Sequence, residues 1–217
     1  MMSIEQERPT LIFDLGGVLI DWNPQYLYRK IFAGSEEEME FFLSTVCPLE
    51  WNEQQDAGRP FAEAIAERSK LFPEYAPYIS AYWDRWEETI SGEISGTVEI
   101  LAALREHNFP LYALSNWSAE TFPLVKNRFE FLSWFTEVFI SGDAGIAKPD
   151  PRFYQHMLER IDHSAGQCLF IDDNERNILA AEKLGFQVFH FTSPDGLREE
   201  LVDRRLIAAN TSIPSSK

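Results

Sequence analysis

The chain has 217 residues, of which 45% are hydrophobic and 25% charged, with a formal net charge of −16. This length and apolar content support a full globular core and argue against a disordered chain. The acidic excess argues against nucleic acid or an anionic membrane as the partner, since the chain has no surplus of basic residues to neutralise their phosphates. A small phosphate ester could still bind, because it needs only local positive charge.

The N-terminal stretch Met1–Arg8 is polar and lacks the apolar segment of a secretory signal. No apolar run approaches the roughly 18 residues that a membrane-spanning helix needs. Cys47 and Cys168 show no metal-ligand or redox spacing, so we expect free thiols in a reducing compartment. These features favour a cytoplasmic protein without a membrane partner.

The first predicted strand covers residues 10–14 and ends on Asp14. A buried parallel strand delivers its last side chain to the carboxyl edge of a sheet, where catalytic groups of α/β proteins lie. Gly16 and Gly17 follow, and glycine lets the backbone turn sharply and approach a ligand. An aspartate before glycines also caps ordinary turns, so Asp14 alone does not separate a catalytic role from a structural one.

Residues 22–91 change to a helical pattern, with apolar side chains at three- and four-residue steps and breaks at Gly34, Pro48, 58–60 and Pro73. The segment predicts a small helical bundle inserted after the first strand, with its many aromatic side chains mostly in the core.

The polar stretch 51–59 is expected to be a loop between two helices of this insert. If the insert covers the crevice, this loop, or Trp22 and Asn23, would touch a substrate. Arg59 is a candidate clamp for the substrate phosphate, with a solvated surface position as the alternative.

The remainder predicts alternating helices and strands. They are a helix through 98–104, strands at 110–114 and 136–140, a helix at 151–161, a strand at 167–171, a helix at 175–184 closed by Gly185, and a strand at 186–190. This alternation indicates an α/β fold with a three-layer, Rossmann-like parallel sheet and right-handed crossovers. Asn210–Lys217 reads as a loose polar tail.

Three polar clusters lie directly after predicted strands or in a loop that follows a strand. They are Ser115-Asn116, Lys148-Pro149 and Asp172-Asp173-Asn174. In an open α/β sheet these positions converge with Asp14 on one crevice. A surface turn at Lys148 and a helix N-cap at Asp172-Asp173 are the alternatives for isolated motifs, but the four motifs together indicate a reaction centre.

This order of motifs resembles the haloacid dehalogenase (HAD) superfamily over nearly the whole chain. Asp14-Leu15-Gly16-Gly17 and the insert after it are similar to the sugar-phosphate phosphatase branch, which includes the N-terminal phosphatase domain of soluble epoxide hydrolases. The resemblance implies a Rossmann-like core from residues 1–21 and 92–217 and a helical cap of the C1 type from residues 22–91. It also implies that the turn after Asp14 and a following hairpin form a flap.

A carboxylate at a strand end can attack phosphorus to give an aspartyl-phosphate, and Asp14 is the expected nucleophile. Mg²⁺ would balance the negative charge, bound by Asp14, the Gly16 carbonyl and Asp173, with Asp172 acting through a bound water. Because adjacent carboxylates repel, Asp172-Asp173 favours a cation between them.

Ser115 and the backbone N–H groups of Asn116 and Trp117 are expected at a helix start, where they would hold phosphate oxygens. Lys148 would stabilise the charge on the transferring phosphoryl group. In haloacid dehalogenases of the resembling superfamily, the counterpart of Asp172 is typically small and uncharged, so the Asp pair favours a phosphatase.

Phosphatases of this superfamily usually carry a general acid two positions after the nucleophile, and Gly16 stands there. General acid catalysis contributes about 10²–10⁴-fold. Either Asp21 or Asp56 substitutes, or the substrate has a good leaving group such as the anomeric hydroxyl of a sugar 1-phosphate.

We therefore expect a Mg²⁺-dependent phosphatase for a small phosphorylated metabolite. Two alternatives remain: a 2-haloacid dehalogenase, active without metal, and a phosphate-binding regulatory protein without turnover. The sequence indicates neither the physiological substrate nor the oligomeric state.

Overall fold

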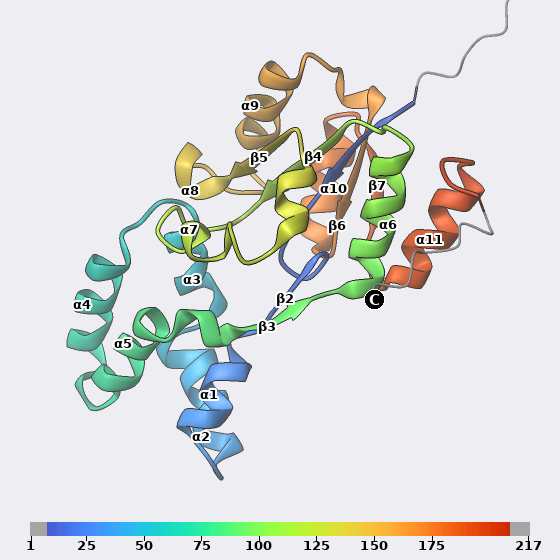
Figure 1. Cartoon of the computed structure of the whole chain (residues 1–217). Helices are drawn as coiled ribbons and strands as arrows, with labels where there is room; N and C mark the ends of the chain where they lie inside the picture. The colour runs from blue at the N-terminus through green and yellow to red at the C-terminus, as the bar shows by residue number, and fades with distance from the viewer. Residues whose placement is uncertain (1–7, 209–217) are drawn as a thin grey trace, which may run out of the picture.

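The fold is organised around a five-stranded parallel sheet with the strand order β5-β4-β1-β6-β7 (Figure 1). The computed structural model describes residues 8–208, so the expected tail Asn210–Lys217 lies outside the described residues. The strands are β1 (Thr10–Phe13), β4 (Leu111–Ser115), β5 (Glu137–Ile140), β6 (Cys168–Asp172) and β7 (Gln187–His190). Because β1 is central and pairs with both β4 and β6, the carboxyl ends of these three strands meet at one place.

Helices cover both faces of this sheet, which confirms the three-layer α/β fold. Side chains alternate along a strand, so Leu11 and Phe13 of β1 face one layer and Ile12 faces the other. The first layer contains α6 (Ser95–Glu106) and α11 (Pro194–Asp203), and the second contains α9 (Pro151–Ile161) and α10 (Glu175–Lys183). All four residues of β1 are buried, as expected of a central parallel strand.

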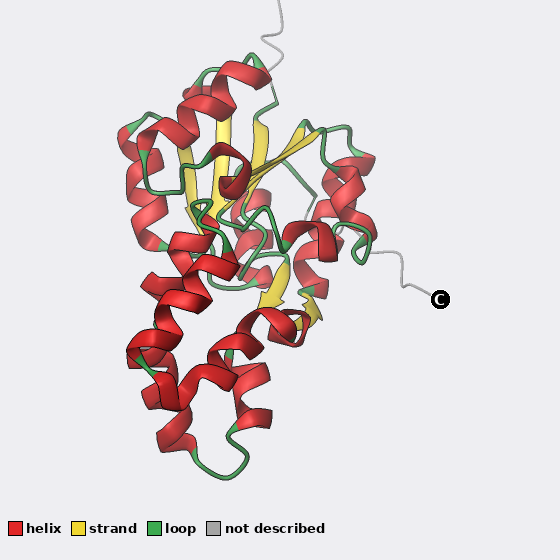
Figure 2. Cartoon of the chain, turned by 90° about the vertical axis from the view of Figure 1, so that its left-hand side faces the viewer, coloured by secondary structure: helices red, strands yellow, loops and turns green. Residues whose placement is uncertain are grey.

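A helical insert separates β2 (Ile20–Trp22) from β3 (Ile90–Glu93), and these two strands pair antiparallel as a ribbon. Figure 2 shows the insert on the far side of this ribbon from the five-stranded sheet. The helices of the insert are α1 (Gln25–Ile31), α2 (Glu36–Phe41), α3 (Leu49–Asp56), α4 (Phe61–Leu71) and α5 (Ala76–Asp84), with shorter helical turns at Phe42–Val46, Pro73–Tyr75 and Trp86–Thr89. Its core is aromatic, with Tyr28, Phe42, Phe61 and Tyr82 fully buried.

The expectation of a loop over 51–59 was wrong, because α3 continues to Asp56. Pro48 stands at the N-cap of this helix, and no helix-breaking residue follows before Gly58, whose φ is +100°. Asn52 and Asp56 are therefore four residues apart on one helical face.

The helix expected directly after β4 was also misplaced, since α7 (Phe122–Val125) begins seven residues after Ser115 and is short. Strand β3 and helix α11 were not predicted. The remaining short helical elements are Glu130–Trp134, α8 (Ser141–Ala144) and Ala165–Gln167.

None of the helices within residues 8–208 has the length and apolarity needed to cross a bilayer. Cys47 and Cys168 are both buried and free.

Candidate active site

Five side chains meet at the carboxyl edge of the sheet, and we call them the reaction cluster: Asp14, Ser115, Lys148, Asp172 and Asp173. Asp14 follows β1, Ser115 ends β4, Asp172 ends β6, and Lys148 lies in the loop after α8. The structure thus brings together the four motifs that the sequence separates.

Asp14 is buried and held from several directions. Its Oδ1 accepts hydrogen bonds from Ser115 Oγ at 2.6 Å and from the Leu15 N–H at 2.7 Å. Its Oδ2 lies 2.9 Å from Lys148 Nζ. Burial raises the pKa of Asp14 to about 7, Asp172 and Asp173 raise it as well, and Lys148 and Ser115 oppose the shift. A cation beside Asp14 would favour the ionised form, which is the nucleophilic one.

Lys148 lies between the two buried carboxylates. Its Nζ donates to Asp172 Oδ2 at 2.7 Å and to the Leu114 carbonyl at 2.7 Å, and pairs with Asp14 Oδ2. Three acceptors match the three N–H groups of an ammonium. Burial alone would lower the pKa of Lys148, but Asp14 and Asp172 outweigh it and hold the pKa above its ordinary value. Lys148 is therefore a fixed positive charge beside Asp14.

The amide of Asn116 positions Lys148 instead of facing a phosphate. Its Oδ1 accepts from the Lys148 N–H at 2.8 Å, and its Nδ2 donates to the Lys148 carbonyl at 2.9 Å. The Trp117 N–H donates to Ser141 Oγ at 2.9 Å. The Trp117 N–H, which was expected to hold a phosphate oxygen, thus donates within the protein, because no helix begins there. The backbone N–H of Asn116 remains a predicted phosphate donor, since these bonds engage only its side chain.

Asp172 is fully buried, and its carboxylate is saturated with donors. Oδ1 accepts from the Asn174 N–H at 2.8 Å and from Asn177 Nδ2 at 3.0 Å, while Oδ2 accepts from Lys148. Asp172 therefore anchors Lys148 and fits an indirect ligand better than a direct one. Sequence reasoning missed Asn177, whose only local signal is its place in the first turns of α10, five residues after Asp172.

Three carboxylates of the reaction cluster fit a hard divalent cation. Ligand oxygens of Asp14, Asp172 and Asp173 lie within 4.8 Å of one another, with Asp173 exposed at the rim. A Cβ at position 17 would lie 2.2 Å from Asp173 Oδ2, and the φ of Gly17 is +73°. Glycine at 17 therefore makes room for the Asp173 carboxylate, and the all-oxygen donor set is the type that Mg²⁺ prefers.

Beside the reaction cluster lies a small cleft of about 60 Å³ between the core and the helical insert. Its lining consists of Gly16, Trp22, Asn52, Asp56, Trp86, Asn116 and Trp117. Arg59 is not part of it, because its guanidinium bonds Gln54 and Glu67 on the insert. Trp22 is a sequence-predicted contact, whereas Asn52 and Asp56 reach the cleft only because α3 is helical.

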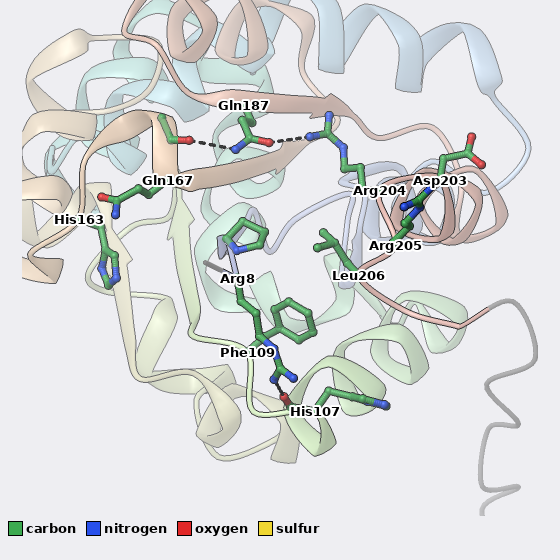
Figure 3. A pocket seen from close by; sticks show the side chains of 12 residues that line it. Arg8, His107, Phe109, His163, Gln167, Gln187, Asp203, Arg204, Arg205 and Leu206 are labelled. Carbon is green, nitrogen blue, oxygen red and sulfur yellow. Dashed lines mark hydrogen bonds between the residues drawn. The ribbon is translucent and has the colours of Figure 1, made fainter. Parts of the chain in front are cut away.

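A larger cavity, about 1120 Å³, lies at the opposite edge of the sheet (Figure 3). Pro9, Phe109 and Gln167 precede β1, β4 and β6 and line it, as do Arg8 and Arg204. Figure 3 shows Gln187 linking Arg204 to the Gly166 carbonyl. No member of the reaction cluster lines this cavity, whereas the smaller cleft is lined by Gly16 and Asn116, which lie close in sequence to Asp14 and Ser115.

Comparisons of the chain with known proteins agree on one family. A family model described as "haloacid dehalogenase-like hydrolase" matches residues 9–185. The chain is 27% identical to the sesquiterpene phosphatase astK of Aspergillus oryzae over 187 residues, covering 83% of this chain and 88% of the relative. It is 27% identical to flavin mononucleotide hydrolase 1 of Arabidopsis thaliana over 223 residues, covering 98% and 83%. A magnesium complex of a HAD family enzyme from Bacteroides thetaiotaomicron shares the fold, with a TM-score of 0.67 at 21% identity over 86% of this chain and 94% of the other.

Proposed function

The chain belongs to the haloacid dehalogenase-like hydrolase family, and we propose that it is a Mg²⁺-dependent phosphatase that forms an aspartyl-phosphate on Asp14. The observation that carries this proposal is the arrangement of one buried carboxylate at a strand end, a fixed ammonium 2.9 Å away and a second carboxylate behind the ammonium at 2.7 Å. This arrangement provides a nucleophile and a charge complement for a phosphoryl group in one place.

Asp14 Oδ2 attacks phosphorus, and the bond to the leaving oxygen breaks. Lys148 and Ser115 keep the Asp14 carboxylate oriented and complement the charge of the phosphoryl oxygens. Water then hydrolyses the aspartyl-phosphate and releases inorganic phosphate.

Mg²⁺ would be held by Asp14, Asp173 and the Gly16 carbonyl, with Asp172 behind them. When bound, it supplies electrophilic stabilisation of the phosphoryl group. Two of the similar proteins support this reading, since one is named a phosphatase and another was crystallised with magnesium.

The substrate proposed is a compact phosphorylated metabolite, with sugar 1-phosphates first to be tested. The cleft has indole walls from Trp22, Trp86 and Trp117, plus the amide of Asn52. The indole N–H of Trp117 is buried and has no hydrogen-bond partner within residues 8–208. Apolar walls with a few polar groups are typical of small-molecule sites.

We propose in addition that residues 1–21 and 92–217 act as the core domain and 22–91 as a cap that admits the substrate. The cleft between them, about 60 Å³, is too small for a sugar phosphate unless the two parts separate. The two buried, free cysteines support a reducing, cytoplasmic compartment.

The test is phosphate release from a panel of sugar phosphates and nucleotides, with Mg²⁺ and with EDTA. We expect Mg²⁺-dependent turnover by the wild type and none by Asp14→Asn, which is nearly isosteric. Asp162→Asn, which removes an exposed carboxylate at the end of α9, is the matched control and should leave turnover unchanged.

Three outcomes would contradict the proposal. Substantial turnover by pure Asp14→Asn would remove the nucleophile assignment. Turnover of 2-haloacids in EDTA would identify a dehalogenase. Binding of phosphate analogues without hydrolysis of any ester would identify a regulatory protein.

A further inference from the structure

The proposed reaction leaves one proton unassigned. When the phosphorus–oxygen bond breaks, the departing alkoxide must gain a proton, and position 16, two residues after Asp14, has no side chain to give one. Among the residues that line the cleft, Asp56 is the only one with an ionisable side chain. It belongs to α3 of the insert, so it approaches the reaction cluster from the side opposite the sheet.

The core holds Asp56 in place through its backbone and its carboxyl group. Ser141 Oγ, at the end of β5, donates to the Asp56 carbonyl. Asn52 Nδ2 donates to Asp56 Oδ2 at 2.9 Å, and the backbone of Ser118 lies near enough to the carboxyl group to favour its ionised form. A nearby bond, from the Phe61 N–H to Glu120 Oε2 at 2.7 Å, fixes the following turn to the core. The position of Asp56 therefore follows from docking of the insert.

The surroundings of Asp56 favour its protonated form. Burial raises the pKa of Asp56 well above its ordinary value, Glu53 and Asp14 raise it further, and the Ser118 N–H opposes them. Tyr82 of α5 is the other titratable group against it, and burial together with Asp56 raises the pKa of that phenol. A carboxyl group that keeps its proton at neutral pH can act as an acid.

We propose that Asp56 is the general acid of this enzyme, an inference that rests on the proposed phosphatase function. As Asp14 bonds to phosphorus and the ester oxygen departs, the Asp56 proton moves to that oxygen and gives a neutral alcohol. The Asp56 carboxylate then takes a proton from the water that attacks the aspartyl-phosphate, so the carboxyl group and free Asp14 are both regenerated.

The competing candidate, Asp21, is less suitable. Its two carboxylate oxygens accept from the Tyr26 hydroxyl, each at 2.9 Å, and Asp21 does not line the cleft. Asp21→Asn is therefore the matched control for Asp56→Asn.

The experiment measures kcat/KM with Mg²⁺ for phosphate esters of graded leaving-group pKa, from p-nitrophenyl phosphate to alkyl phosphates. The wild type should show a shallow dependence. Asp56→Asn should lose about 10²–10⁴-fold on alkyl esters and less than about tenfold on p-nitrophenyl phosphate, which needs no proton. In the wild type, kcat/KM for alkyl esters should fall at high pH, because Asp56 then loses its proton. Asp56→Asn should show no such fall, whereas Asp21→Asn should match the wild type in its leaving-group dependence and in its pH dependence.

A rescue variant separates chemistry from structure. A Cβ at Gly16 has no atom within 4 Å, and the φ of Gly16 is not positive, so the backbone admits a side chain at this position. Gly16→Asp in the Asp56→Asn background should restore alkyl-ester hydrolysis at least tenfold. A steep dependence in the wild type would overturn the proposal without any variant, and so would equal losses on aryl and alkyl esters in Asp56→Asn. If the folded wild type hydrolyses no ester, the phosphatase function itself fails, and the role of Asp56 fails with it.

Discussion

Replacing Asp14 by asparagine should stabilise the metal-free protein, and the gain should grow with pH. In the folded protein the pKa of Asp14 is raised from 3.8 to about 7, first by burial and then by Asp172 and Asp173. A carboxyl group with a raised folded pKa binds more protons folded than unfolded. Stability therefore falls as pH rises from about 4 to about 7 and is level above that. Asparagine does not ionise, so the variant lacks this loss.

The size of the effect follows from the shift. Three pKa units correspond to about 4 kcal/mol at pH 8, as an upper bound. Asp14→Asn also takes one charged partner from Lys148, although an amide oxygen can still accept its hydrogen bond, so a net gain of about 2 kcal/mol is expected. In a chain of this size that gain raises the midpoint of thermal unfolding by roughly 4–8 °C. At pH 5 only rather more than a third of the wild-type penalty has developed, which is close to the cost of the lost charged partner of Lys148, so little or no net gain should remain.

The assay is thermal unfolding of wild type, Asp14→Asn and Asp162→Asn in EDTA at pH 5 and pH 8, repeated with Mg²⁺. The wild type should gain more from Mg²⁺ than Asp14→Asn, since it offers one more charged ligand. An equal midpoint difference at both pH values, or a less stable Asp14→Asn at pH 8, would refute the reasoning.

Four further variants test two members of the reaction cluster and the two glycines beside it. Asp173→Ala should raise the Mg²⁺ concentration for half-maximal activity at least tenfold and raise the unfolding midpoint in EDTA; an unchanged metal requirement would place the metal elsewhere. Lys148→Met should lower kcat at least about 10²-fold and cost about 3–5 kcal/mol in denaturant unfolding, because two buried carboxylates lose their counter-ion; wild-type kcat would exclude the assigned role. Gly17→Ala should weaken Mg²⁺ activation and lower the free energy of unfolding by about 1–2 kcal/mol, since its Cβ meets the Asp173 carboxylate. Gly16→Ala should leave the stability nearly unchanged, because a Cβ there has open space. Similar losses of stability in both variants would contradict this account.

The sequence predicted the sheet and the convergence of its polar motifs because both signals are local. Each core strand is a short apolar run, and Asp14 and Asp172 stand where two of those runs end. Once the alternation of helices and strands indicated a parallel sheet, the carboxyl edge was determined by topology alone. The predicted helix over 151–161 has the same bounds in the structure.

Contacts within the site were not predictable in the same way. A helix start was expected at Asn116 and Trp117, but the chain continues as a loop in which the side-chain amide of Asn116 bonds the backbone of Lys148, a contact that the sequence does not indicate. The pairing of β2 with β3 joins segments on either side of the whole insert, so neither strand carries a local signal for it. Helix α11 did have a signal, since Ser193 caps it and Pro194 follows.

The sequence offers Asp21 and Asp56 as candidates for the general acid, and the position of Asp56 shows why the sequence alone does not decide between them. The role of Asp56 depends on α3 being helical, on the insert packing against the core, and on the contacts that Ser118 and Ser141 make with Asp56. Under the proposed mechanism the proton donor reaches the leaving oxygen only when the insert is docked, because α3 brings Asp56 to the cleft and Ser141 of the core bonds its backbone there. Proton donation is thereby coupled to closure of the cleft and to exclusion of bulk water. An acid at position 16 would lack this coupling, since it would remain beside Asp14 whether the insert were docked or not.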